Sequence, residues 1–297
     1  MTNYNKEYKI GNKKVIVDKF GLTEKEFLSQ YNPEDYDKPS ISVDMLVFTI
    51  DNNELKLLLA KRESHPFINC WTLPGGFVRL NETTEDAAKR RLKEEVGLEN
   101  IYLEQLFTSS EVDRDPRMRV ISTSYIALTD KKNLNPIAGD DTLDIAWFTV
   151  SRNVKSTNKD GTIHSELTIS NRELDVSIKV EVINVPKKNG VITAYETKIN
   201  QISDTMLAFD HAKIINIAVD RLRNKIEYTH IAFNLVEEYF SLPELQKVYE
   251  IILGKKLYKT NFRRKIAPMV IETDNFIETS RRHAKLYKFN SKYNIQN

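Results

Sequence analysis

The sequence is poor in cysteine, since Cys70 is the only one among 297 residues. One cysteine cannot form an intramolecular disulfide, and a zinc site built from cysteine pairs needs more than one. A small disulfide-stapled domain and a cysteine-based zinc finger are therefore excluded. This usage is typical of a reducing compartment, and we expect a cytoplasmic location.

Long apolar runs are missing too. No stretch approaches the roughly 18 apolar residues of a membrane-spanning helix. The first 14 residues, MTNYNKEYKIGNKK, lack the apolar centre of a signal peptide. We expect no membrane partner. Hydrophobic residues nevertheless make up 40% of the chain and charged residues 29%, so a sizeable core fits, and 297 residues are enough for two domains.

The formal net charge of +2 is unevenly distributed. Residues 221–297 contain 15 Lys and Arg against 8 Asp and Glu, a net charge of +7, so the rest of the chain carries −5. A basic C-terminal part attached to a mildly acidic body favours a polyanionic partner for that part. On charge alone, a solvated basic surface explains the same numbers equally well.

Hydrophobic periodicity predicts an N-terminal extension, 1–40, a first domain, 41–226, and a second domain, 227–297. The extension contains one expected short helix, capped by Thr23. In the first domain a long helix is predicted over 83–96, and Gly97 is expected to end it. Apolar stretches rich in β-branched residues predict strands at 41–50, 55–61, 101–109, 120–128 and 145–150. Strands interrupted by one long helix indicate an α+β fold with mixed layers.

Residues 151–205 have a different pattern, with strong alternation and no helical period. Three alternating stretches, with PKKNG between the last two, predict strand–turn–strand units. We interpret 151–205 as a β-rich insertion. It forms either an added β-hairpin layer or a large elaboration of the first domain's sheet.

Helical periodicity returns after Phe209. Asp210 is a candidate N-cap for a helix over 211–225, and a short helix is expected over 230–239. Ser241 and Glu244 form a capping-box pattern ahead of the next helix. The last helix is expected to begin with Thr260 as its cap, and two strands follow it.

This order of helices and strands is typical of a winged helix-turn-helix domain. The last helix turns Phe262, Ile266 and Met269 inward and its polar residues outward, and Pro268 is expected to end or bend it. Arginine and asparagine are side chains that read guanine and adenine edges in the major groove. The expected DNA contacts are Lys259, Thr260, Asn261, Arg263, Arg264, Lys265 and, at the bend of the wing, Arg281 and Arg282. The alternative is a basic helical domain that binds protein or nothing.

The stretch WTLPGGFVRLNETTEDAAKRRLKEEVGL, residues 71–98, resembles the Nudix box. The matching positions are Gly76, Glu82, Arg90, Glu94, Glu95 and Gly97, with Leu92 and Leu98 at the apolar places. The resemblance implies a Nudix α/β/α sandwich and, in active members, Mg²⁺-assisted cleavage of a pyrophosphate. The alternative without a function is that Glu94 and Glu95 only form a solvent-exposed helix face.

Arg91 departs from the box. Positions 91, 94 and 95 share one face of a helix, and in active Nudix members all three are carboxylates. Arginine removes one oxygen ligand and places a cation beside Glu94 and Glu95, which remain as weak metal ligands. We therefore expect Mg²⁺ binding to be weakened and no cofactor to be required. We expect the guanidinium to pair with Glu95 or to hold a phosphate directly.

Both halves together resemble the NrtR family, Nudix-related transcriptional regulators that end in a winged helix. Further matches are YLEQL (102–106), RDPR (114–117), AGDD (138–141), FDH (209–211), ELQKVYEIILG and NFRRKI. The resemblance implies a homodimeric DNA-binding repressor that senses ADP-ribose or a related sugar or nucleotide in the Nudix cleft. The expected ligand-binding residues are Arg79, Arg91, Glu94, Glu95, Arg117 and Arg119. The insertion at 151–205 is expected to depart from the family.

Two other functions compete with this hypothesis. One is a Mg²⁺-dependent hydrolase of ADP-ribose or another nucleoside diphosphate derivative, whose basic domain serves dimerisation. The other is a purely structural interaction module. Arg91 and the cationic last helix favour the regulator, with weak or absent hydrolysis.

Overall fold

The N-terminal 39 residues form a small unit separate from residues 40–297. The computed structural model describes residues 6–10, 13–99, 101–130, 142–278 and 283–293. The small unit pairs β1 (Lys6–Ile10) with β2 (Lys13–Val17) and continues into α1 (Glu24–Gln30). Thr23 caps α1 through a capping box with Glu26, which confirms the predicted cap.

One large sheet organises residues 40–297, and it has ten strands within the described part of the chain. The main strand order is β12-β11-β10-β9-β4-β3-β8-β7, with β5 paired to β4 and β6 paired to β3. The strands are β3 (Ser40–Asp51), β4 (Glu54–Arg62), β5 (Trp71–Thr72), β6 (Gly75–Phe77), β7 (Tyr102–Ser109), β8 (Val120–Leu128), β9 (Thr142–Thr157), β10 (Ile163–Asn171), β11 (Val176–Asn189) and β12 (Ile192–Gln201). Among these pairings, β3 and β8 run parallel, and the other pairs are antiparallel. The strands predicted at 41–50, 55–61, 101–109 and 120–128 are confirmed to within two residues.

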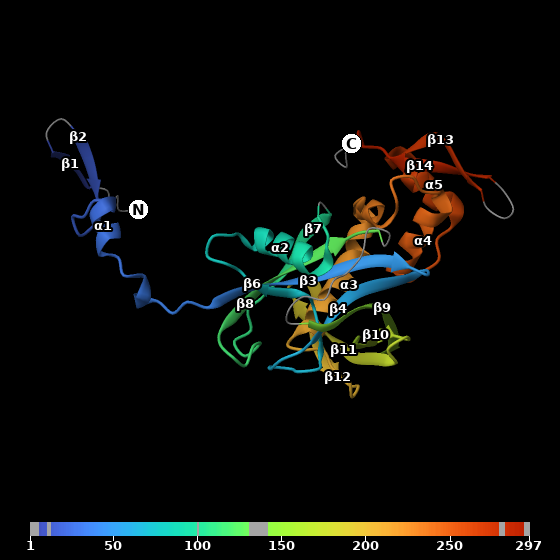
Figure 1. The fold of residues 1–297 in the computed structure, drawn as a ribbon, viewed down its shortest axis with the longest axis horizontal. Coiled ribbons are helices and arrows are strands. Elements are labelled where there is room, and N and C mark those ends of the chain that lie inside the picture. Colours follow the sequence, from blue (N-terminus) through green and yellow to red (C-terminus); the bar gives the residue numbers. More distant parts are fainter. Residues whose placement is uncertain (1–5, 11–12, 100, 131–141, 279–282, 294–297) are drawn as a thin grey trace. The chain divides into compact units, whose positions relative to one another are not determined.

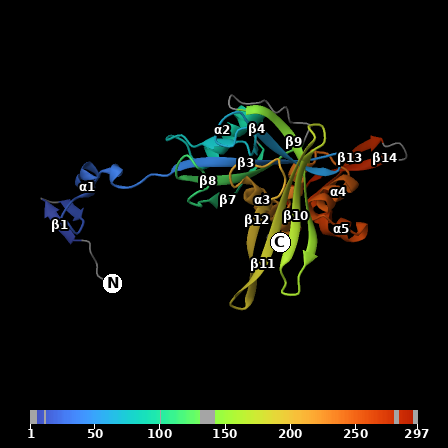
Figure 2. The ribbon, with the colours of Figure 1, turned by 90° about the horizontal axis from the view of Figure 1, so that it is seen from below.

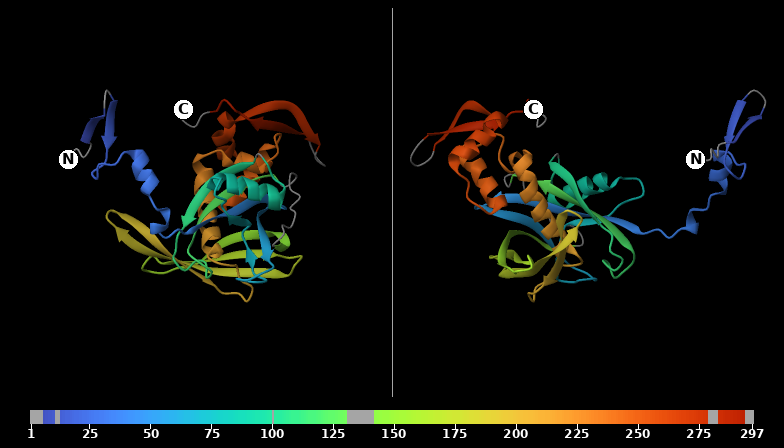
Figure 3. Two further views of the ribbon diagram at one scale, coloured as in Figure 1. Left: turned by 60° about the vertical axis from the view of Figure 1, so that its left-hand side comes forward. Right: turned by 180° about the vertical axis from the view of Figure 1, so that it is seen from behind.

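Helices cover both faces of this sheet (Figures 1 and 3). Side chains alternate along a strand, so one set of β3 residues, which includes Val43 and Met45, packs against α2 (Thr84–Val96). The other set, which includes Leu46 and Phe48, belongs to the core beneath α3 (His211–Tyr228). The result is the α/β/α sandwich that the resemblance implied.

Segment 151–205 continues this sheet and does not build a separate layer. β9 is 16 residues long, much longer than the predicted 145–150, and β10, β11 and β12 add to it as successive antiparallel neighbours (Figure 2). Of the two expectations for the insertion, elaboration of the first sheet is therefore correct. The turn is shorter than PKKNG, because Asn189 already pairs with Ile192 and only Gly190 and Val191 lie between them.

The C-terminal part is a winged helix. It consists of α4 (Leu242–Leu253), α5 (Lys259–Ile266) and the hairpin β13 (Val270–Glu278) and β14 (His283–Phe289), drawn from orange to red in Figure 1. Two expectations need correction. Residues 230–239 contain only a 3-10 turn over Ile231–Leu235, and α5 begins before Thr260 with Tyr258 as its N-cap. The helix does end ahead of Pro268, as predicted.

No helix of the described residues is long and apolar enough to cross a membrane. The helix ends otherwise follow local chemistry. α2 begins with a capping box between Thr83 and Asp86, and α4 begins with the predicted box between Ser241 and Glu244. Gly97 adopts the left-handed conformation at the C-terminal end of α2, as predicted.

Candidate functional site

A cleft of about 350 Å³ opens where β3, β4, β6, α2 and the start of α3 meet. Its volume lies within the range of small-molecule sites. Seven basic side chains line it, namely Lys61, Arg62, Arg79, Arg90, Arg91, Arg114 and Arg117. Only three acidic ones do so, namely Asp44, Glu95 and Asp115. The excess of cations suits an anionic ligand.

Close approach explains the glycine pair at one wall of the cleft. A Cβ atom on Gly75 would lie 2.2 Å from the carbonyl oxygen of Val43, so only glycine fits there. A Cβ atom on Gly76 would lie 3.0 Å from Nε of Arg91. The two glycines thus let the backbone of β6 lie directly against β3 and against the side chain of Arg91.

Glu82 and Arg90 brace the loop that leads into α2. Arg90 donates to both carboxylate oxygens of Glu82, at 2.9 and 2.6 Å, and to the carbonyl of Phe77 at 3.3 Å. The bond from Arg90 lowers the pKa of Glu82 to about 2. In this arrangement Glu82 is a permanent anion committed to Arg90. Its role here is to hold the loop between β6 and α2.

The guanidinium of Arg91 binds three oxygen-bearing groups beside the cleft. It donates to the carbonyl of Gly75 at 2.9 Å and to Glu94 at 3.3 Å, and it forms an ion pair with Glu95. A carbonyl and two carboxylates are the oxygen donors that Mg²⁺ uses, and here one guanidinium binds all three. The predicted pairing of Arg91 with Glu95 is confirmed. The donor set does not fit a metal ion while Arg91 stays in place, and the described residues contain no group of three or more His, Cys, Asp or Glu that could hold one.

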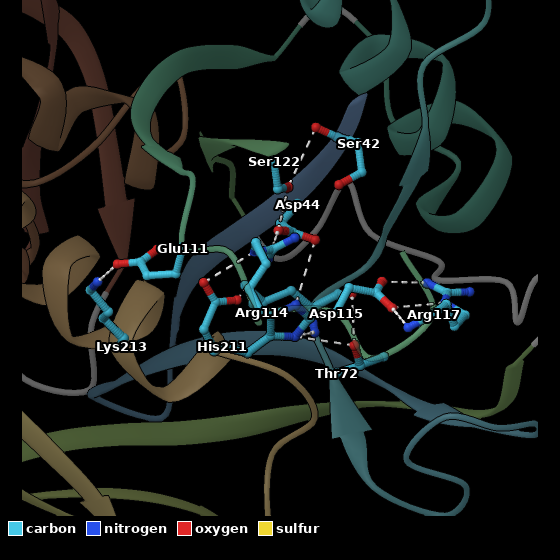
Figure 4. A network of polar contacts seen from close by, with 12 residues as sticks. Ser42, Asp44, Thr72, Glu111, Arg114, Asp115, Arg117, Ser122, His211 and Lys213 are labelled. Atoms are coloured by element: carbon cyan, nitrogen blue, oxygen red, sulfur yellow. Dashed lines mark hydrogen bonds and ion pairs between the residues drawn. The ribbon is translucent and has the colours of Figure 1, made fainter. Parts of the chain in front are cut away.

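A buried polar network forms the floor of the cleft (Figure 4). Arg114, 4% exposed, bridges Asp44 of β3 at 3.3 Å and Asp210, just before α3, at 2.7 Å. The Oγ of Ser122, on β8, donates to Asp44 at 2.6 Å. Burial raises the pKa of Asp44, but His211, Arg114 and Ser122 together hold it below its ordinary value. Asp44 therefore stays ionised beneath the ligand cleft.

His211 closes the network from the first turn of α3. The backbone N–H of Leu73 donates to its Nδ1 at 3.0 Å, and the Thr72 hydroxyl lies 3.1 Å from the same atom. The other ring nitrogen, Nε2, lies 3.5 Å from the carboxylate of Asp44. These contacts fix the start of α3 to β3 and to β5.

Arg117 lies between aromatic rings at the mouth of the cleft. Its guanidinium carbon is 5.5 Å from the centroid of Phe77 and 5.9 Å from that of Phe209. Asp115 accepts two hydrogen bonds from it, at 3.0 and 2.7 Å, which raise the pKa of Arg117 further. A fixed cation between aromatic faces offers both charge and stacking to a ligand.

Four of the six expected ligand-binding residues line the cleft, namely Arg79, Arg91, Glu95 and Arg117. The other two, Arg119 and Glu94, lie outside the lining of the cleft. Arg119 donates to the backbone carbonyls of Glu111 and Ser110, so it supports the loop between β7 and β8. Glu94 lies outside the cleft lining and is held by Arg90 and Arg91.

Several cleft residues were missed from sequence, chiefly Asp44, Arg114, Phe77, Phe209 and His211. Arg114 belongs to the matched motif RDPR, and Phe209 and His211 belong to FDH, so these motifs were the available signal. Asp210 is not a side-chain cap of α3, because its carboxylate binds Arg114 instead. Asp44 lies within an apolar strand and gave no signal.

The winged helix presents one polar face of α5. Phe262 and Ile266 are buried, and Phe262 packs against Tyr249 of α4 with ring centroids 5.3 Å apart. Six of the expected DNA contacts are exposed, namely Lys259, Thr260, Asn261, Arg263, Arg264 and Lys265. Arg281 and Arg282 lie outside the described residues.

Lys265 is also engaged within the protein. Its Nζ donates to the carbonyl of Glu227 in the last turn of α3, at 2.9 Å, and lies 5.2 Å from the ring centroid of Tyr249. Partial burial lowers the pKa of Lys265, although Glu227 opposes that effect. In this structure Lys265 ties α5 to α3.

Comparison with known proteins assigns both parts. Residues 40–167 match the NUDIX domain and residues 232–289 match the NrtR DNA-binding winged helix domain. The chain is 32% identical, over 90% of its length and 88% of the relative's, to the ADPR responsive transcriptional repressor NtrR of Acinetobacter baylyi. The chain belongs to the NrtR family.

Two solved structures are similar to this chain over most of its length. A crystal structure of a MutT/nudix family protein from Enterococcus faecalis covers 91% of this chain and 94% of its own, with 32% identity and a TM-score of 0.68. The structure of NrtR from Shewanella oneidensis complexed with a 27mer DNA covers 84% of this chain and 93% of its own, with 28% identity and a TM-score of 0.61.

The match to the NUDIX domain runs to residue 167 and therefore includes the first part of segment 151–205.

Proposed function

We propose that this protein is a cytoplasmic transcriptional repressor that binds operator DNA as a homodimer and responds to ADP-ribose or a closely related sugar nucleotide. The observation that carries the proposal is a cation-rich cleft in which Arg91 binds the carbonyl of Gly75 and the carboxylates of Glu94 and Glu95, within a chain that also carries a winged helix. The relative from Acinetobacter is named for its response to ADPR, and the relative from Shewanella is seen on DNA.

The ligand class follows from the lining of the cleft. Several guanidinium groups favour the two negative charges of a pyrophosphate, since arginine binds phosphate oxygens through paired N–H donors. Phe77 and Phe209, with Arg117 between them, give flat surfaces for a base or a ribose. A neutral sugar would use fewer of these cations. We expect Mg²⁺ to bind weakly and not to be required for the response.

Helix α3 connects the ligand cleft to the DNA-binding part. Its first residue, His211, lines the cleft, and its last turn accepts the bond from Lys265 of α5. Arg223, near its end, donates to the carbonyls of Arg152 on β9 and Ile252 on α4, at 3.1 and 3.3 Å. A ligand that favours one position of α3 would therefore favour one position of α4 and α5, which is what a change in DNA affinity requires.

The direct test is binding to a duplex from the protein's own upstream region, followed by fluorescence anisotropy with and without ADP-ribose. We expect sequence-specific binding that ADP-ribose changes by more than fivefold, the lower end of typical allosteric coupling. Arg117→Ala should bind the duplex normally and lose the response, whereas Arg264→Ala should lose DNA affinity and still bind ADP-ribose. A wild-type protein that binds none of the neighbouring duplexes at modest salt contradicts the proposal.

A Mg²⁺-dependent hydrolase is the second candidate, because Glu82, Arg90, Glu94 and Glu95 of the box are present. The contacts of Arg91 argue against it. Fast cleavage of ADP-ribose by the wild-type protein in Mg²⁺ would establish the hydrolase instead.

A further inference from the structure

The main strand order of the large sheet ends in β7 on one side and in β12 on the other, and these two edge strands differ in how they are protected. β7 carries a bulge between Gln105 and Phe107, and Arg221 and Lys225 of α3 reach over to Glu104 on it. β12 pairs with β11 over ten continuous residues without a bulge. A long, regular and uncovered edge is where another strand can add to a sheet.

The composition of β12 favours such an addition. The strand, ITAYETKINQ, has no proline and no glycine, and its first seven residues are all exposed. Ile192 is 74% exposed and Tyr195 51%. Its only charged residues are Glu196 and Lys198, which have opposite sign and point to the same face because they are two positions apart.

We propose that β12 pairs antiparallel with β12 of a second copy of this chain, with Thr197 on the twofold axis. That the protein is a dimer rests on the proposed function, since two winged helices on one operator require two copies. The proposal assigns the surface that joins them and the register of the contact. The two sheets would thereby continue into each other across the axis.

The charges of the strand select this register. In a twofold pairing, if residue i faces residue j, then j also faces i. With Thr197 opposite its own equivalent, Glu196 faces Lys198 of the second copy, and the same contact forms twice. Centring on Glu196 would oppose two glutamates, and centring on Lys198 would oppose two lysines, which destabilises a pair of strands.

The neighbouring positions agree with this choice. Tyr195 would face Ile199 of the second copy, an aromatic–β-branched pair of the kind that stabilises adjacent strands. Glu196 already forms an ion pair with Lys187 on β11, which lowers the pKa of Glu196 and holds its carboxylate on the outer face of the hairpin.

Cysteine cross-linking tests the register. In a Cys70→Ser background, Thr197→Cys should give a disulfide-linked dimer on mild oxidation, because directly opposed residues have Cα atoms about 4.5–5.5 Å apart. The matched control, Thr193→Cys, lies on the same strand and is also exposed. In the proposed register its two copies lie eight positions apart, roughly 27 Å, and should not cross-link. Equal cross-linking of the two variants, or none from Thr197→Cys, overturns the proposal.

Charge exchange tests the contact without cysteine. Glu196→Lys alone and Lys198→Glu alone should each weaken the dimer about tenfold or more by sedimentation, because each opposes like charges twice. The double exchange should restore the wild-type dimer. If none of the three variants changes the strength of the dimer, the interface is refuted and the proposed function is unaffected. A dimer with this register that binds no operator DNA refutes the function while leaving the interface intact.

Discussion

Replacing Arg91 with glutamate tests whether its guanidinium substitutes for a metal ion. The change removes the bonds to Gly75, Glu94 and Glu95 and adds a third carboxylate on the same helix face. In metal-free buffer the three carboxylates repel one another, so Arg91→Glu should be less stable than the wild-type protein. In Mg²⁺ the same oxygens become ligands, and the variant should recover stability.

The size of the effect follows from the charges. Arg91→Glu changes the charge at position 91 by two units. Mg²⁺ carries two positive charges, so the change in its interaction with position 91 equals four interactions between unit charges. Arg91 and Glu94 have side chains 27% and 41% exposed, so solvent screens them. At a water-like dielectric constant, one such interaction at about 4 Å is worth about 1 kcal/mol. We therefore expect Mg²⁺ to bind about 4 kcal/mol more tightly, roughly a thousandfold.

Calorimetric titration with Mg²⁺ and thermal unfolding with and without Mg²⁺ measure this gain. Arg91→Gln is the matched control, because it removes the cation without adding a ligand and should show about half of the gain in binding free energy. Cleavage of ADP-ribose in Mg²⁺ is measured in parallel, and any activity is expected to increase in Arg91→Glu. The reasoning fails if the wild-type protein binds Mg²⁺ as tightly as Arg91→Glu, or if the two variants behave alike.

Three further predictions concern other parts of the molecule. Arg264→Ala should weaken operator binding by about 1–3 kcal/mol if Arg264 contacts a base. Lys265→Ala should weaken operator binding less, because Lys265 is bound to α3. Anisotropy with matched and mismatched duplexes separates base contacts from phosphate contacts. Arg114→Met should lower the free energy of unfolding by about 3–5 kcal/mol in urea, since it removes the guanidinium that bridges two largely buried carboxylates, and a loss under 1 kcal/mol would contradict the bridge. The pKa of Glu82 is about 2 in the folded protein against an ordinary value of 4.5, so its contribution to stability is complete above about pH 4.5 and is lost as the pH falls towards 2. Acid unfolding of Glu82→Gln should therefore be less steep in that window, and an unchanged curve would show that Arg90 gives Glu82 no net stabilisation.

Sequence patterns predicted the elements of the fold well where local chemistry determines them. Capping boxes at Thr23 and Ser241 and the glycine stop at Gly97 are short-range signals, and all three are confirmed. The patterns could not show that 151–205 continues the first sheet, because strand neighbours depend on long-range pairing. Thr260 was assigned as a cap by residue type alone, although the chain enters α5 at Tyr258.

The side-chain pairings of the candidate site were predictable only along α2. Arg91 and Glu95 are four residues apart on one helix, so their pairing follows from helical spacing. The floor of the cleft instead joins residues distant in sequence, such as Thr72 and His211, which are 139 positions apart. Arg119 lies outside the cleft lining and donates to the backbone of its own loop, a contact that the sequence motif does not show.

The way α3 is anchored explains how one helix can serve both ligand and DNA. At its start, Arg114 holds Asp210 by two hydrogen bonds, at 3.2 and 2.7 Å, and His211 is held by Leu73. Its 18 residues span about 27 Å, and its last turn accepts the bond from Lys265. A helix held at both ends moves as a unit, because its own backbone bonds resist local deformation. A ligand that pulls Arg114 or its loop towards a phosphate therefore acts on the position of α5 through α3, and it needs no path through the sheet.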